Sequence, residues 1–153
     1  MGASAYILGL RERIGHALLL MPSVAVLVRD ATGRVLLMKS ADTGDWQTIG
    51  GAIDPDETPE AAAHREALEE AGIAIRLGRV LGALGGPEYR MTYPNGDEMA
   101  YITIVFEAYV DGGTMTPDGE EASALEWWEL SDLKGCQMHS LTKALLRSVG
   151  LMQ

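Results

Sequence analysis

The sequence predicts an α+β fold, in which helices cover both faces of a mixed β-sheet. Apolar runs of strand length alternate irregularly with stretches of helical periodicity. Short turns rich in glycine and asparagine join several of the strand candidates and indicate hairpins. The strand candidate at 23–30 is apolar on both faces, which is typical of a strand buried between two layers. A mixed sheet between helices accommodates all three observations.

Chain length limits the number of domains, and net charge limits the kinds of partner and substrate. The 153 residues suit one domain over residues 1–153, and 47% apolar with 22% charged residues is ordinary for a soluble globular protein. The net charge of −10 would repel nucleic acids and anionic membranes, so neither is expected as a partner. It would also repel a phosphate substrate unless a cation mediates. Cys136 is the only cysteine, which favours a reducing, cytoplasmic location. The sequence leaves a homodimer open.

The remaining elements follow from periodicity and turn signals. Residues 1–20 are expected to form an N-terminal helical segment, because Ile7, Leu10 and Ile14 recur at helical spacing from residue 3 onward. A last helix is expected over 139–149, after a short turn capped by Ser131. Strands are predicted at 23–30, 34–39, 46–53, 73–84, 99–110 and 124–130, with a bend at Gly78 and turns at 31–33, 95–96 and 111–113.

The loop and helix over residues 50–73 carry the strongest signals. A diglycine leads into a helix that Thr58 can cap, with Pro59 at its first position. Gly72 marks the helix end, since glycine is the usual residue there. This loop-helix is therefore expected to be well defined.

The helix concentrates negative charge. At about 100° per residue, Glu66, Glu69 and Glu70 fall within one arc. They repel one another and lie near the C-terminal end, where the helix dipole disfavours anions. Such residues either stay in water or bind cations, and oxygen ligands suit Mg²⁺ or Mn²⁺. Arg65 can hold a loop carboxylate such as Glu57. The opposite side of the helix, expected to face the sheet, carries Ala61, Ala67, Leu68 and Ala71.

The spacing of these residues resembles a family motif. The Nudix box reads G-x5-E-x7-R-E-U-x-E-E-x-G-U, where U is a bulky aliphatic residue. One position departs, because Ala67 stands where a larger aliphatic is usual, and upstream Ile49 takes the place of a common proline. The chain therefore resembles the Nudix hydrolase family. The matching residues are Gly51, Glu57, Arg65, Glu66, Glu69, Glu70, Gly72 and Ile73.

The resemblance implies a fold, a cofactor and roles. The fold would be a Nudix-type α/β/α sandwich with a central mixed sheet. Glu66, Glu69 and Glu70 would bind Mg²⁺ or Mn²⁺ with help from the Gly50 carbonyl, while Glu57 and Arg65 would brace the loop. The general base stays open: it could be Glu70, Glu66 or a carboxylate of the polar loop, Glu120 or Glu121. The catalytic set is then Glu57, Arg65, Glu66, Glu70 and Glu121.

The implied reaction is metal-dependent hydrolysis of a pyrophosphate bond in a small nucleotide. The substrate would be a nucleoside diphosphate linked to another moiety, such as ADP-ribose or a nucleoside triphosphate, oxidised or not. Trp46, Tyr89, Arg90 and Trp127 are the candidates for binding it, although each aromatic could instead pack in the core. Trp127 and its neighbour Trp128 should point to opposite faces of a strand. Two alternatives remain: a catalytically silent nucleotide sensor and an acidic interaction module.

Overall fold

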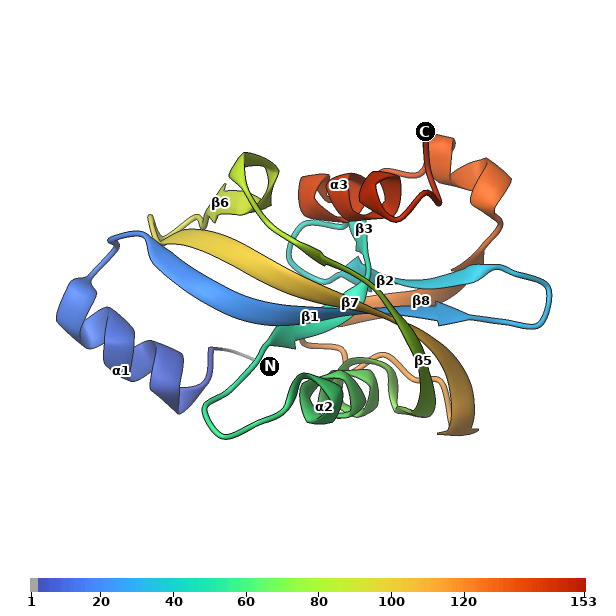
Figure 1. Cartoon of the computed structure of the whole chain (residues 1–153), viewed down its shortest axis with the longest axis horizontal. Helices are drawn as coiled ribbons and strands as arrows, with labels where there is room; N and C mark the ends of the chain where they lie inside the picture. Colours follow the sequence, from blue (N-terminus) through green and yellow to red (C-terminus); the bar gives the residue numbers. More distant parts are fainter. Residues whose placement is uncertain (1–2) are drawn as a thin grey trace.

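The computed structural model describes residues 3–153; the first two residues of the expected N-terminal segment lie outside it. These residues form an eight-stranded mixed sheet with strand order β3-β2-β1-β7-β5, while β4 pairs with β1, β6 with β7 and β8 with β2. Helix α2 covers one face and α3 the other (Figure 1). The expected α+β sandwich is confirmed.

Element bounds follow the predicted pattern closely. The strands are β1 (Leu19–Arg29), β2 (Val35–Ser40), β3 (Trp46–Gln47), β4 (Ile49–Ala52), β5 (Ile73–Leu84), β6 (Arg90–Thr92), β7 (Glu98–Gly113) and β8 (Ala122–Trp128). The helices are α1 (Ala5–Ile14), α2 (Pro59–Ala71) and α3 (Ser140–Ser148), with 3₁₀ turns η1 (Pro87–Tyr89) and η2 (Leu130–Gly135).

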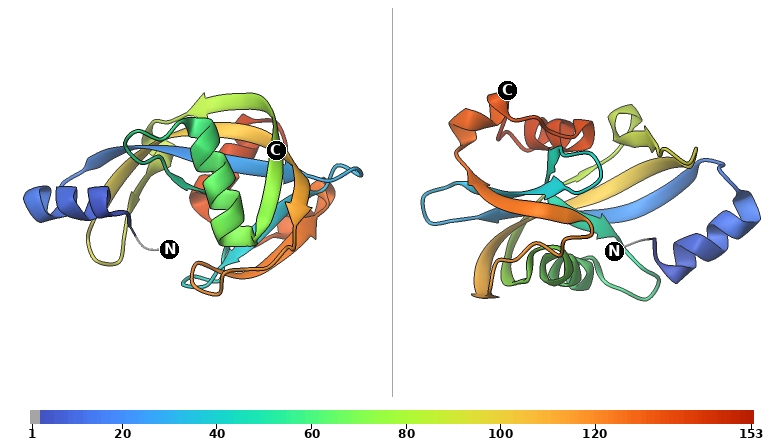
Figure 2. Two further views of the ribbon diagram at one scale, coloured as in Figure 1. Left: turned by 90° about the horizontal axis from the view of Figure 1, so that it is seen from below. Right: turned by 180° about the vertical axis from the view of Figure 1, so that it is seen from behind.

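The N-terminal helix is shorter than predicted. It ends at Ile14, because Gly15 adopts φ 60° and its N–H bonds to the Arg11 carbonyl. The chain then enters β1, which runs parallel to β7 from the Leu19–Met99 pair onward. Helix α1 projects from this end of the sheet (Figure 2). Pairing with a distant strand thus overrides the local helical spacing.

Two other local expectations are wrong. The predicted turn at 111–113 is strand, since Gly112 and Gly113 pair with Ala74 and Ile73 of β5. Turn η2 begins at Leu130 with no side-chain cap, so Ser131 does not cap it. The bend expected near Gly78 is confirmed, because the β5–β7 register shifts between Leu77 and Val80.

Alternation along β1 divides the core into two layers. Val24 and Val26 pack with the alanines of α2, whereas Ala25 and Leu27 pack with α3. A smaller cluster joins Ile7 of α1 to the sheet end. Within residues 3–153, no helix has the length and apolar character needed to cross a membrane.

Helix α2 is rotated relative to the prediction. Its buried alanines include Ala62 and Ala67, but Leu68 is 62% exposed. Ala61, also expected to face the sheet, is exposed as well. The expectation that Leu68 faces the sheet is therefore wrong, and Glu66 and Glu70 turn inward instead.

Candidate active site

The loop-helix begins and ends at the predicted residues. The Thr58 hydroxyl accepts the Ala61 N–H at 3.1 Å, and Pro59 occupies the first turn. Gly72 takes the left-handed conformation, and its N–H bonds to carbonyls of the last turn. These local signals fix the length of α2 independently of what it packs against.

The two glycines of β4 each allow a close approach, Gly50 to the neighbouring strand β1 and Gly51 to the helix α2. Gly50 has φ 152°, and a Cβ there would overlap the Val24 carbonyl oxygen of the paired strand. A Cβ on Gly51 would overlap the Glu66 carboxylate. The absence of a side chain at Gly51 thus leaves the space that the Glu66 carboxylate fills, whereas its absence at Gly50 allows β4 to lie close to β1.

Glu66 and Glu70 are buried carboxylates. Glu70 is 3% exposed and accepts the Gly50 N–H at 3.0 Å, while Glu66 is 8% exposed. Burial raises the pKa of Glu70 well above its usual value, and the nearby charge of Glu66 raises it further. Burial also raises the pKa of Glu66. Two adjacent buried acids of this kind mark a site that favours positive charge.

Arg65 joins the loop to the helix. Its Nε and Nη2 donate to the two oxygens of Glu57 at 2.8 and 3.0 Å, and Nη2 also donates to the Ala52 carbonyl at 3.0 Å. Its Nη1 donates to Glu66 at 2.7 Å and to Glu69 at 3.2 Å. The Arg65 hydrogen bond lowers the pKa of Glu57. The expected contact between Arg65 and Glu57 is therefore present.

A second acidic segment reaches the site from the loop before β8. Glu121 lies within hydrogen-bonding reach of Glu70, and its charge contributes to the raised pKa of both Glu66 and Glu70. The other candidate of this loop, Glu120, is exposed. The loop is tied to the end of α2 by the Thr116 N–H, which donates to the Ala71 carbonyl at 2.9 Å.

Sequence reasoning missed the residue that shapes this loop. Asp118 Oδ1 accepts the backbone N–H groups of Glu120, Glu121 and Ala122 at 3.0, 3.0 and 2.8 Å. An aspartate followed by glycine, with a strand after it, is a turn signal that could have pointed to this arrangement. Asp118 thus fixes the backbone that presents Glu121.

The donor set fits a hard divalent cation. Glu66, Glu69, Glu70 and Glu121 offer only carboxylate oxygens, which Mg²⁺ and Mn²⁺ prefer. Burial strengthens the repulsion between the Glu66 and Glu70 carboxylates, and a bound cation would relieve it. In this structure Arg65 donates hydrogen bonds to Glu66 and Glu69. Within residues 3–153, no three acidic, histidine or cysteine side chains lie close enough together to form a ready-made set of metal ligands.

Three of the predicted substrate-binding residues lie away from these carboxylates. Tyr89 is buried and faces Ser148 of α3. Trp46 packs in the α3-side cluster, with its ring 5.4 Å from that of Trp128. Arg90 lies in β6, separated from β4 by both β7 and β1. The structure does not bring these three to the site.

Trp127 differs from the other three candidates. It packs against the α2-side cluster, and Trp128 packs on the α3 side, so the expected opposite orientation is confirmed. The Arg34 guanidinium lies 5.9 Å from the centre of the Trp127 ring. Among the three aromatic candidates, Trp127 alone faces the layer that carries the glutamates.

Comparison with known proteins identifies relatives of this arrangement. A Streptomyces ambofaciens MutT-like protein is 32% identical over 105 residues, 69% of this chain and 61% of the relative. A Bacillus subtilis protein provisionally named an 8-oxo-dGTP diphosphatase is 33% identical over 102 residues, 67% of this chain and 62% of the relative. The chain thus spans less than two thirds of the length of these curated relatives.

Solved structures share the fold. The MutT protein of Methanosarcina mazei Go1 superposes with a TM-score of 0.66 at 22% identity, covering 85% of this chain and 92% of that one. An ADP-ribose pyrophosphatase of Streptococcus suis gives 0.64 at 21% identity, covering 86% and 87%. The NUDIX domain profile matches residues 19–147. The chain therefore belongs to the NUDIX family.

Proposed function

We propose that this chain hydrolyses a phosphoanhydride bond in a nucleoside diphosphate linked to another moiety, with Mg²⁺ or Mn²⁺ as cofactor. The observation that carries the proposal is the buried pair of Glu66 and Glu70 beside Glu121. Two neighbouring buried acids are costly for a fold unless a cation or proton compensates them. A site for a divalent cation accounts for that cost.

The residues divide into a metal-holding group and a bracing group. Glu66, Glu69 and Glu70 would hold the metal, with the Gly50 carbonyl as a further candidate ligand. The bound metal would neutralise phosphate charge and make an attacking water more acidic. Glu57 and Arg65 keep the loop against the helix through their paired hydrogen bonds. We assign the general base to Glu121, because it reaches Glu70 from a separate loop.

The substrate class rests on the chemistry of the relatives. The Bacillus subtilis relative is named for 8-oxo-dGTP, and a Deinococcus radiodurans relative, 31% identical over 117 residues, is named an NAD-capped RNA hydrolase. Both substrates contain a phosphoanhydride between a nucleoside and a second group. The net charge of −10 favours a small nucleotide over RNA. Trp127 remains the candidate contact for its base, and a cytoplasmic location remains a prediction.

A substrate panel tests the reaction. The protein is incubated with ADP-ribose, 8-oxo-dGTP and ATP, in Mg²⁺ or in EDTA, and the released monophosphate and phosphates are measured. We expect Mg²⁺-dependent cleavage of at least one compound. Binding without cleavage, detected as a shift in Tm, would instead identify a nucleotide sensor.

A variant pair tests the assignment of the site. Glu70→Gln should lower turnover by about 10²–10³-fold while the fold survives, because it removes one charge at the reacting centre. Glu60→Gln, an exposed glutamate in the first turn of the same helix, is the matched control and should retain turnover. Full Mg²⁺-dependent activity in Glu70→Gln would rule out the metal assignment.

A further inference from the structure

We infer that the part of the sheet lying beyond α2 is a dimer interface, and that a second copy of this chain covers it. The surface, called the open face below, consists of Leu18, Leu20, Pro22 and Ile102. In the β1–β7 register Pro22 stands opposite Ile102, so the two strands contribute adjacent residues.

Strand alternation shows which face of the sheet this is. Leu20 and Pro22 alternate in step with Val24, whose side chain packs under α2. Val24 is paired with Gly51, the glycine that faces Glu66. The open face is therefore the continuation of the α2-covered face, past the point where the helix stops covering it.

The open face exposes large apolar side chains. Leu18, Leu20 and Ile102 are 45%, 64% and 43% exposed. On the opposite face of the same strand ends, Met21 and Met99 are 1% and 5% exposed and pack against α1. The strand ends are thus well packed on one side only. A contiguous apolar surface of this kind commonly marks an interaction site.

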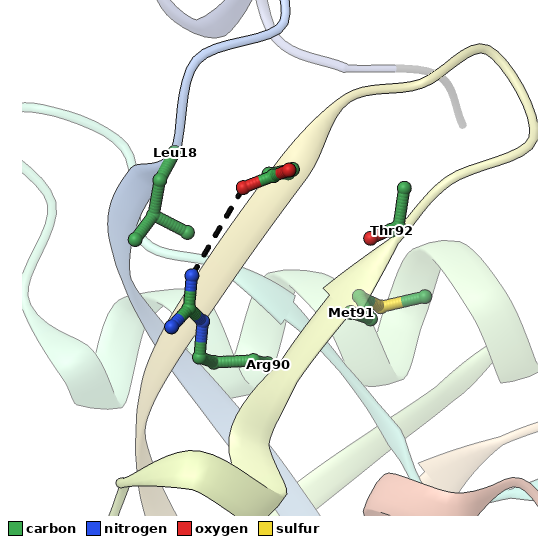
Figure 3. A pocket seen from close by; sticks show the side chains of 5 residues that line it. Leu18, Arg90, Met91 and Thr92 are labelled. Atoms are coloured by element: carbon green, nitrogen blue, oxygen red, sulfur yellow. Dashed lines mark ion pairs between the residues drawn. The ribbon is translucent and has the colours of Figure 1, made fainter.

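A charged pair borders the open face. Arg90 Nη2 lies 4.0 Å from a Glu98 carboxylate oxygen, and the two side chains are 54% and 51% exposed. Arg90, Leu18 and Glu98 line a hollow of about 310 Å³, across which Figure 3 shows the guanidinium extending from β6 toward Leu18. An exposed pair at this separation contributes little to the stability of the monomer. Both charges thus remain available to a partner.

Charge complementarity indicates a second copy as the occupant. A two-fold axis through the open face would place Arg90 opposite Glu98 of the partner subunit, and the reverse pair would form by symmetry. The exposed Leu20 would meet an apolar surface of the same composition, with the hollow beside Leu18 able to receive a side chain. An apolar centre with a polar border is the usual anatomy of a protein interface.

Charge reversal provides a decisive test. Wild type is examined by sedimentation equilibrium between about 1 and 100 μM, a range that covers micromolar dimers. We expect a dimer. Arg90→Glu and Glu98→Arg should each weaken it about tenfold or more, because each replaces both opposite-charge contacts with like-charge ones. An equimolar mixture of the two variants should restore a dimer, since every contact between unlike protomers then joins opposite charges.

A leucine pair controls for general effects of a surface charge. Leu20→Asp should give a monomer, whereas Leu68→Asp, at a leucine of nearly equal exposure on the outer side of α2, should leave the dimer intact. Circular dichroism and Tm verify that each variant is folded. A monomeric wild type at 100 μM, about the upper limit of the range above, would overturn the proposal. So would a dimer that survives Leu20→Asp, or a mixture of the charge variants that stays monomeric.

Discussion

The covered and open parts of one sheet face break the usual burial rule in opposite ways. Under α2, two carboxylates are buried beside valines and alanines. Beyond the helix, leucines and an isoleucine are exposed beside an arginine. Buried polar groups and exposed apolar groups are the informative exceptions in a folded chain.

The difference between the two parts indicates what each one lacks. The covered part holds negative charge that Arg65 compensates incompletely, so it favours a cation, and an anionic substrate would bind there only through that cation. The open part has exposed apolar area and a pair of opposite charges with no net charge, so it favours an apolar partner surface that carries the same two charges. One face can thus carry a catalytic site and an interface without either using the other's residues.

The largest expected effect on turnover comes from adding one methyl group to the covered part of the sheet face, and the same addition to the open part is its control. Gly51→Ala places a Cβ against the Glu66 carboxylate and should lower turnover about 10²-fold, because a small displacement of a reacting group is enough. Gly85→Ala places a Cβ against the end of the Ile102 side chain, which is exposed and can rotate away. Turnover of the Gly85→Ala variant should match wild type. Equal losses of turnover in both variants would show that catalysis does not depend on the position of Glu66 beside Gly51.

The next effect is on the pH dependence of the free energy of unfolding in the absence of metal. The folded state raises the pKa of Glu66 and Glu70, so above pH 4.5 it binds more protons than the unfolded state and the free energy of unfolding falls as pH rises. Glu70→Gln should weaken this decline and become more stable than wild type near pH 8 in EDTA. Urea unfolding at several pH values measures this effect, with Glu60→Gln as the control for loss of an exposed charge. Mg²⁺ should restore the stability of wild type.

A smaller effect is expected at the loop that presents Glu121. Asp118→Ala removes an acceptor for three N–H groups and should lower the free energy of unfolding by about 1 kcal/mol, as for other side-chain caps. Asp118→Asn keeps the acceptor oxygen and should cost less. Turnover should fall in Asp118→Ala and recover in Asp118→Asn. Unchanged turnover in Asp118→Ala would separate the loop from catalysis.

The smallest effect tests the orientation of α2. Leu68→Ala should change the free energy of unfolding by no more than about 0.5 kcal/mol, because the side chain is mostly in water. Ala67→Leu, at the fully buried neighbour, should cost about 1–3 kcal/mol through overpacking. A loss of several kcal/mol in the free energy of unfolding of Leu68→Ala would show that this side chain is buried, contrary to the structure.

Local chemistry could be predicted from the sequence, and long-range packing could not. Thr58, Gly72 and the box spacing define the loop-helix within 23 residues, so its bounds and the Arg65–Glu57 contact were predictable. The orientation of α2 was not, because an apolar Leu68 looks like a core residue until Gly51 is seen to make room for Glu66.

The same limit applies to the strand ends and the substrate contacts. Gly112 and Gly113 look like a turn, but pairing with β5 keeps them in strand conformation. Tyr89 and Trp46 look like binding residues, but their neighbours come from the C-terminal third of the chain, with Ser148 beside Tyr89 and Met138 bridged to Trp46. Single-residue type carries no information on such distant partners.

The parallel pairing of β1 with β7 also constrains how the protein folds. Leu19 pairs with Met99, 80 positions later, so this contact closes a long loop that contains α2 and the diglycine. Closing long loops is entropically costly and makes folding slow relative to helical proteins. Glu121 follows β7 in the chain, so a nascent polypeptide has the box helix well before it has the loop. If the proposed metal ligands come from both acidic segments, metal affinity measured during refolding should appear only once those segments have met.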